Sequence, residues 1–265
     1  MLFRTLLLVF FIGLSVCARA KDFQPFAGPQ PLAVLVEEDP LAPVVGAETP
    51  HIAIYENGDV IYAREGSGKR GTTYFYAKLS YEALSAITAK LETVTDLPEI
   101  KPVYSVSESP DDGSALFYFH VDGRETVISV HGLNRQGEKA AHSGNLPAAI
   151  RELYDYLWTL DFQEARRWHP VYVEAMVWPD DEAPGKSLPW PKSWPDLGSD
   201  RAITRGNGFS IFLDSSMQGD LEKFVSFANP DDAVEIDGRK WSLAWRPVFP
   251  SDPVWRKAFA DVKGN

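Results

Sequence analysis

Five histidines are the side chains of this sequence best suited to bind a transition metal: His51, His120, His131, His142 and His169. Zinc sites without cysteine take three histidine or carboxylate ligands. A predicted hairpin places His120 opposite Glu125, and His131 and His142 bracket the following loop, so these three histidines form a conceivable site. Their spacing matches neither His-x3-His nor His-Glu-x-x-His, and exposed polar residues on a strand and a loop explain them better. We therefore predict no metal site and no cofactor.

Nucleophilic chemistry has no recognisable motif. The sequence contains no Gly-x-Ser-x-Gly elbow and no Gly-x4-Gly-Lys-Ser/Thr loop, and its acidic pairs lack the alternating spacing of a calcium loop. A glycosidase needs two carboxylates about 5–10 Å apart, but 37 acidic residues offer too many pairs to choose from. The catalytic residues therefore stay unknown, and the sequence leans away from an enzyme.

A stretch rich in tryptophan and proline is the strongest candidate for a binding surface. Residues 179–208 have no periodic pattern, and three tryptophans in or next to this stretch are each followed by proline. Long loops inside compact domains are often functional. Proline stiffening with tryptophans anchored in the core is the favoured interpretation, and a rigid aromatic platform for a glycan, peptide or protein is the alternative. The platform residues would be Trp178, Trp190, Trp194, Asp180, Asp181 and Asp196.

Residues 1–20 have the three parts of a secretory signal. Arg4 precedes an apolar run from Leu6 to Val16, and Cys17-Ala-Arg-Ala20 has the small-x-small pattern of a cleavage site. The run is about half the length that a spanning helix needs. Lipidation at Cys17 is an alternative, disfavoured by the branched Val16 before it. We therefore expect a soluble, exported protein, periplasmic or extracellular.

Charge and cysteine content narrow the classes of partner. Cleavage after Ala20 removes two of the 26 basic residues and leaves 24 against 37 acidic ones, a formal net charge of −13. Such a surface repels nucleic-acid phosphate and anionic headgroups, so we expect no nucleic acid and no membrane contact beyond the signal peptide. The mature chain would have no cysteine and hence no disulfide, and no glycosylation sequon is present. These features favour a bacterial origin.

The fold class expected from these patterns is α+β, with antiparallel sheets built from hairpins and helices packed on one face. Residues 21–50 contain six prolines and predict an extended leader, with Leu32–Val36 docking as an edge strand. Residues 51–165 predict hairpins at Asn57-Gly58 and Asp122-Gly123. Helices capped by Ser80 and Asn145 should follow these hairpins.

Residues 166–265 form the second expected subdomain, because all eight tryptophans lie from Trp158 onwards. It combines strands near 171–178 and 209–213, a helix near 217–228, a hairpin at Asp237-Gly238 and a final helix from Asp252. In that hairpin Glu235 should face Lys240.

The function expected from the sequence is a non-enzymatic binding or accessory protein of the cell envelope, with a protein, peptide or glycan partner. An acidic inhibitor or immunity-type protein is the alternative, because negative charge steers a basic target. A carboxylate-based glycan hydrolase is a weaker one. The sequence does not determine the oligomeric state or the ligand.

Overall fold

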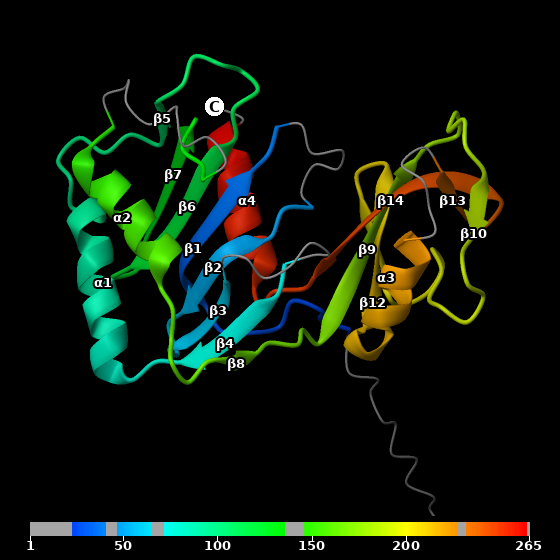
Figure 1. The fold of residues 1–265 in the computed structure, drawn as a ribbon, viewed down its shortest axis with the longest axis horizontal. Coiled ribbons are helices and arrows are strands. Elements are labelled where there is room, and N and C mark those ends of the chain that lie inside the picture. Colours follow the sequence, from blue (N-terminus) through cyan, green and yellow to red (C-terminus); the bar gives the residue numbers. More distant parts are fainter. Residues whose placement is uncertain (1–22, 41–46, 65–71, 136–145, 227–231, 264–265) are drawn as a thin grey trace, which may run out of the picture.

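The computed structural model describes residues 23–40, 47–64, 72–135, 146–226 and 232–263. The predicted signal peptide, Cys17, His142 and Asn145 lie outside these residues. The chain has mixed α/β content, with four α-helices and two mixed, mostly antiparallel sheets among the described residues. Figure 1 shows the two sheets side by side along the long axis of the molecule.

The first sheet has eight strands in the order β5-β7-β6-β1-β2-β3-β4-β8. All neighbours pair antiparallel except β5 with β7. In this order the strands span Val103–Ser105, Arg124–His131, Ser114–Val121, Pro31–Glu38, Pro50–Tyr55, Asp59–Ala63, Tyr74–Lys78 and Arg166–Arg167.

The strand β1 lies in the middle of the first sheet, between β6 and β2, and the expectation of an edge strand in a leader was wrong. Residues 31–36 are all buried. Pro31 occupies the first position of the strand, where a missing donor is tolerated. Leu32–Val36 contains no proline and can therefore pair on both sides, so the prolines of the surrounding segment were a misleading guide to this strand.

Helices cover both faces of the first sheet rather than one. The helices α1 (Tyr81–Thr95) and α2 (Ala148–Thr159) pack with Ala33 and Leu35 of β1 in one core. The C-terminal helix α4 (Asp252–Lys263) packs with Val34 and Val36 in another core on the opposite face, because successive side chains of a strand alternate. The sequence assigned this helix to the second unit, but its packing places it on the first sheet.

The local signals for helix starts and turns can be compared directly with the structure. Ser80 caps α1 as predicted and accepts a hydrogen bond from the Ala83 amide. Asp122-Gly123 and Asp237-Gly238 both have positive φ, as two-residue hairpin turns require. The Asn57-Gly58 hairpin forms, but it has positive φ at the glycine alone and a longer turn, closed by a bond from the Gly58 amide to the Tyr55 carbonyl.

The second sheet has six strands in the order β10-β13-β14-β9-β12-β11, and helix α3 (Gln218–Ser226) packs on one of its faces. Glu235 faces Lys240 in its hairpin, as predicted. The stretch 179–208 is not wholly irregular, because it contributes two short strands at the two edges of the sheet. In sheet order the strands span Ser187–Pro189, Ala233–Ile236, Arg239–Pro247, Tyr172–Pro179, Gly208–Asp214 and Ala202–Arg205.

Three described segments join the sheets, and the first is the short connection from β8 to β9. The long strand β14 leaves the second sheet and leads into α4, which lies over the first sheet (Figure 1). Residues before β1 also reach the second sheet, where Phe23 packs edge-on against Tyr172 and Phe26 against Phe212. The two ends of the described chain therefore both hold the sheets together.

Replacing Trp255 tests the packing of α4. This side chain is fully buried in the core between α4 and the first sheet, so Trp255→Ala should lower the free energy of unfolding by about 3–5 kcal/mol. Tyr81→Ala is the matched control, because Tyr81 also lies in the first turn of a helix but is 81% exposed. Chemical denaturation should show almost no change for the control. Equal losses in the two variants would contradict this packing.

Candidate functional site

The three tryptophans of the expected platform lie on two different faces of the second sheet. Trp190 is only 8% exposed, packs in the core under α3, and donates its indole N–H to the Pro195 carbonyl at 2.8 Å. Trp194 packs edge-on against it, with ring centroids 4.9 Å apart. Trp178 follows Val177, which faces this same core, so Trp178 points to the opposite face of the sheet. The structure does not bring the three rings together.

The aspartates of the expected platform are also dispersed. Asp180 accepts a hydrogen bond from the Ser242 hydroxyl at 2.6 Å, and Asp181 pairs with the guanidinium of Arg239 at 3.2 Å. Asp196 accepts from the amide of Gly198 two residues later, as in a turn. These contacts are local, and they do not form a polar rim around a shared aromatic surface.

The conceivable histidine site is not assembled by the described residues. His120 pairs with Glu56 at 2.7 Å, next to the hairpin turn, while His131 contacts the Ser109 carbonyl at the other end of the same strands. Within the described ranges no group of three or more His, Cys, Asp or Glu side chains could hold a metal ion.

Three glycines between β3 and β4 have the spacing of a dinucleotide-binding loop. Gly66, Gly68 and Gly71 have the Gly-x-Gly-x-x-Gly spacing and lie outside the described residues. The strands that flank them, β3 and β4, pair antiparallel. A dinucleotide fingerprint instead opens a helix after its strand, whereas the next described element after β3 is the strand β4.

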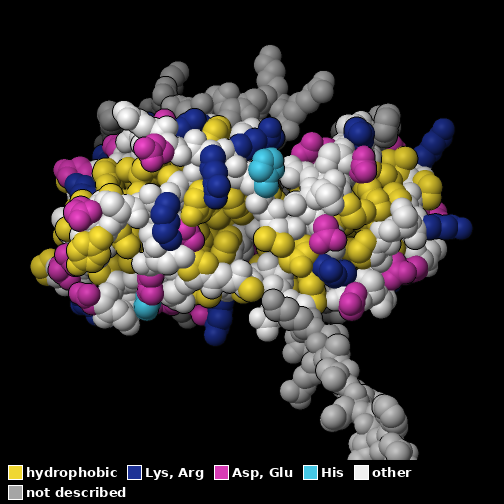
Figure 2. Space-filling view, turned by 90° about the horizontal axis from the view of Figure 1, so that it is seen from below, with side chains coloured by type: hydrophobic (Ala, Val, Ile, Leu, Met, Phe, Trp, Pro, Cys, Tyr) yellow, Lys and Arg dark blue, Asp and Glu magenta, His cyan; other side chains and the backbone are white. Residues whose placement is uncertain are grey.

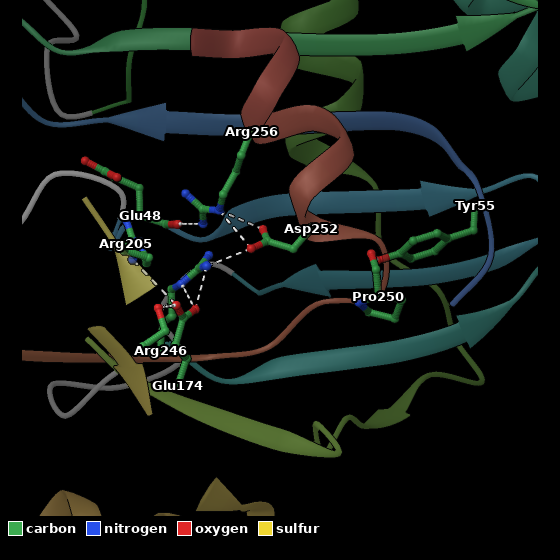
Figure 3. A network of polar contacts seen from close by, with 9 residues as sticks. Glu48, Tyr55, Glu174, Arg205, Arg246, Pro250, Asp252 and Arg256 are labelled. Carbon is green, nitrogen blue, oxygen red and sulfur yellow. Dashed lines mark hydrogen bonds and ion pairs between the residues drawn. The ribbon is translucent and has the colours of Figure 1, made fainter. Parts of the chain in front are cut away.

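A buried ion network lies where β9 and β14 of the second sheet meet the start of α4 (Figure 3). Arg246, on β14, is 3% exposed and lies directly opposite Glu174 on β9. Its guanidinium contacts Glu174 Oε2 at 2.6 Å and Asp252 Oδ2 at 2.7 Å, and both carboxylates are 1% exposed. Arg256 binds both oxygens of Asp252, and Arg205 approaches Glu174 at 3.5 Å. One guanidinium thus joins two carboxylates from separate parts of the fold.

The sequence singled out Asp252 only as the start of a helix, and none of the other members of this network was identified from it. One signal was present in the strand pattern: Glu174 interrupts an apolar run of β9, and Arg246 follows the apolar stretch of β14. A charged residue inside an otherwise apolar strand is uncommon unless it is paired. The partner could not be chosen from the sequence, because the pairing depends on the register of β14 against β9 and on the position of α4.

Burial and opposite charge act against each other in this network. Burial raises the pKa of Asp252 to about 6, against the opposing effect of Arg246. Burial favours the neutral form of Arg246, but the charges of Asp252 and Glu174 outweigh it and raise the pKa of the guanidinium. At neutral pH the network therefore contains an ionised Asp252 and a charged Arg246.

An open cleft of about 340 Å³ lies beside the network, between the second sheet and the start of α4. Among the described residues, Nη1 of the buried Arg246 has no hydrogen-bond partner, although this residue lines the cleft. Buried polar atoms are usually hydrogen-bonded. The cleft is lined by Phe26, Glu174, Ile203, Arg205, Ser210, Phe212, Arg246, Asp252, Pro253, Arg256 and Lys257.

Comparisons with known proteins found no relative of this chain. No protein-family model matches it, and neither curated proteins nor solved structures gave a match. In the described part of the chain, no helix has the length and apolar character needed to cross a membrane.

Arg246→Met should destabilise the protein by about 3–5 kcal/mol, because it leaves two buried carboxylates without their shared cation. The matched control is Arg239→Met on the same strand, which removes an ion pair with Asp181 that is exposed on both sides. Such exposed pairs contribute little. Urea denaturation measures both changes, and equal effects would show that the buried network does not anchor the fold.

The raised pKa of Asp252 predicts a particular pH dependence. The folded state keeps this proton up to about pH 6, whereas the ordinary value is 3.8. The folded state binds more protons between these values, so this residue's contribution to the free energy of unfolding falls as pH rises from about 4 to 6 and is constant above. This residue changes the free energy of unfolding by at most about 1.4 kcal/mol per pH unit. Asp252→Asn should remove this part of the pH dependence. Parallel stability curves for variant and wild type would contradict the assignment.

Proposed function

We propose that this chain is an exported, non-enzymatic binding protein of the cell envelope that holds a small anionic ligand in the cleft beside Arg246. The observation that carries the proposal is that Arg246, whose guanidinium keeps an unpartnered Nη1 shielded from solvent, lines an open cleft. The volume of about 340 Å³ lies at the lower end of the range of ligand sites. The export part of the proposal rests on the signal pattern of residues 1–20.

The charge of the cleft supports an anion. Its lining contains four cationic side chains and two carboxylates, a formal excess of two positive charges in a chain whose net charge is −11. The carboxylates are already bound by arginines, whereas Lys257 is exposed on α4 and Arg246 retains its free Nη1. A cationic cleft on an acidic molecule attracts an anion locally, while the negative charge of the remaining surface favours solubility.

A carboxylate-based hydrolase is the second candidate, because Glu174 and Asp252 are buried near each other and the pKa of Asp252 is raised to about 6. The two carboxylates contact the same nitrogen of Arg246. A glycosidase needs the scissile bond between its carboxylates, and here the guanidinium occupies that position. The geometry therefore suits binding better than proton transfer to a sugar.

The inhibitor alternative has less support. Figure 2 shows acidic and basic side chains interspersed with apolar ones over the face seen from below, rather than a concentrated acidic surface.

We further propose that each sheet forms the core of a subdomain. Sheet membership would place the second one near residues 172–247, inserted between β8 and α4.

A pair of fluorescent probes tests the proposed site. 8-Anilino-1-naphthalenesulfonate carries an anionic group that the closely related N-phenyl-1-naphthylamine lacks. The sulfonate should bind more tightly, and Lys257→Glu should weaken it on the order of tenfold while leaving the neutral probe unchanged.

Lys192→Glu is the matched control for this experiment. Lys192 is exposed on the second sheet's side of the molecule and does not line the cleft, so the substitution changes the net charge by the same amount. Equal weakening by the two substitutions would mean that the probe responds to overall charge, and it would overturn the proposed site.

A further inference from the structure

Apolar side chains form a second wall of the cleft, apart from its cations. Phe212 is buried on β12 and packs edge-on against Phe26 from the segment before β1, with ring centroids 5.4 Å apart. Ile203 on the edge strand β11 is 40% exposed, and Pro253 lies on the other side in the first turn of α4. An exposed branched side chain beside two aromatic rings offers apolar surface that a ligand can cover.

The cations and the apolar wall lie on adjacent parts of the same cleft. Ile203 and Ser210 are cross-strand partners, so the side chain of Ile203 lies on the same sheet face as the Ser210 hydroxyl. That hydroxyl donates to Glu174 Oε1 at 2.5 Å, and Glu174 in turn binds Arg246. Ser210 and Glu174 therefore link Ile203 of the apolar wall to the guanidinium of Arg246.

These observations lead beyond an unspecified anion. Resting on the proposed function, we infer that the ligand is a carboxylate attached to an apolar body, with the carboxylate at Lys257 on the side of the cleft that Arg246 lines and the apolar body against Ile203, Phe212 and Phe26. The chemistry is shared by a free aliphatic acid and by the C-terminal residue of a peptide that ends in an apolar side chain.

A single carboxylate suits this site better than a multiply charged phosphate. Guanidinium N–H groups match carboxylate and phosphate alike, so the charges around the cleft decide between the two. Glu174 and Asp252 border the same cleft and repel a dianion more strongly than a monoanion. The apolar wall then adds affinity for the uncharged part of the ligand, in proportion to the apolar area that binding removes from water.

Calorimetric titration of the full chain with octanoate, 1-octanol, acetate and sulfate tests the inference. Octanoate should bind at least about tenfold more tightly than each of the other three, because it alone has both a carboxylate and an apolar body. Binding of octanol as tight as that of octanoate would overturn the inference. Binding of acetate or sulfate as tight as that of octanoate would also overturn it, and would leave the proposed anion site standing.

Two surface variants assign the two ends of the ligand without disturbing the buried network. Ile203→Ser should weaken octanoate on the order of threefold to tenfold and leave acetate unchanged, since it removes apolar surface only. Lys257→Gln should weaken both. If Lys257→Gln changes neither, the cleft is not the binding site and the proposed function fails along with the inference.

A further pair of ligands distinguishes the two sources of this chemistry. N-acetyl-leucine and N-acetyl-leucinamide differ in the terminal carboxylate of a C-terminal residue. Tighter binding of the acid than of the amide supports the inference. Tighter binding of N-acetyl-leucine than of octanoate indicates a peptide C-terminus, and the reverse order indicates an aliphatic acid. Equal binding of acid and amide would contradict a role for the carboxylate.

Discussion

The contact of Arg246 with two buried carboxylates is the interaction on which the arrangement of the two sheets depends. Glu174 lies inside the second sheet, and Asp252 opens the helix that covers the first. Each of these charges would be costly to bury alone, because removal from water strongly disfavours an isolated ion. The guanidinium offsets part of that cost for both carboxylates, so the observed position of the sheets, which pairs all three charges, is favoured over positions that separate them. The cleft follows from this position, since its walls come from the second sheet on one side and from α4 on the other.

Local sequence signals predicted local structure well. The three glycine-containing turns, the Ser80 cap and the pairing of Glu235 with Lys240 depend on a few neighbouring residues, and each forms. The position of β1 could not be predicted in this way. Its neighbours β6 and β2 are chosen by long-range packing, and a count of prolines over thirty residues concealed the eight residues 32–39, which contain none. The placement of α4 failed for the same reason, because an amphipathic helix does not specify which sheet it covers.

The candidate site could not be predicted from the sequence, for a different physical reason. Its charged residues are spread between positions 174 and 257, and their meaning depends on strand register and on burial. The tryptophans drew attention because they are rare and large, yet Trp190 proved to be a core residue whose indole satisfies a nearby carbonyl. Glu174 was the better indicator, since a carboxylate in an apolar strand requires a partner. Composition highlights rare residues such as tryptophan, whereas this site consists of common arginines and carboxylates that are unusual only because they are buried.

The central strand of the first sheet comes from the beginning of the described chain, and the helix over one of its faces comes from the end. The Tyr55 hydroxyl donates to the Pro250 carbonyl across 195 residues. During synthesis, the core beneath α4 therefore stays open until the residues of this helix are available, and contacts of such long sequence separation form slowly. The larger core on the opposite face, under α1 and α2, contains no residue of α4 and does not have to wait for this helix.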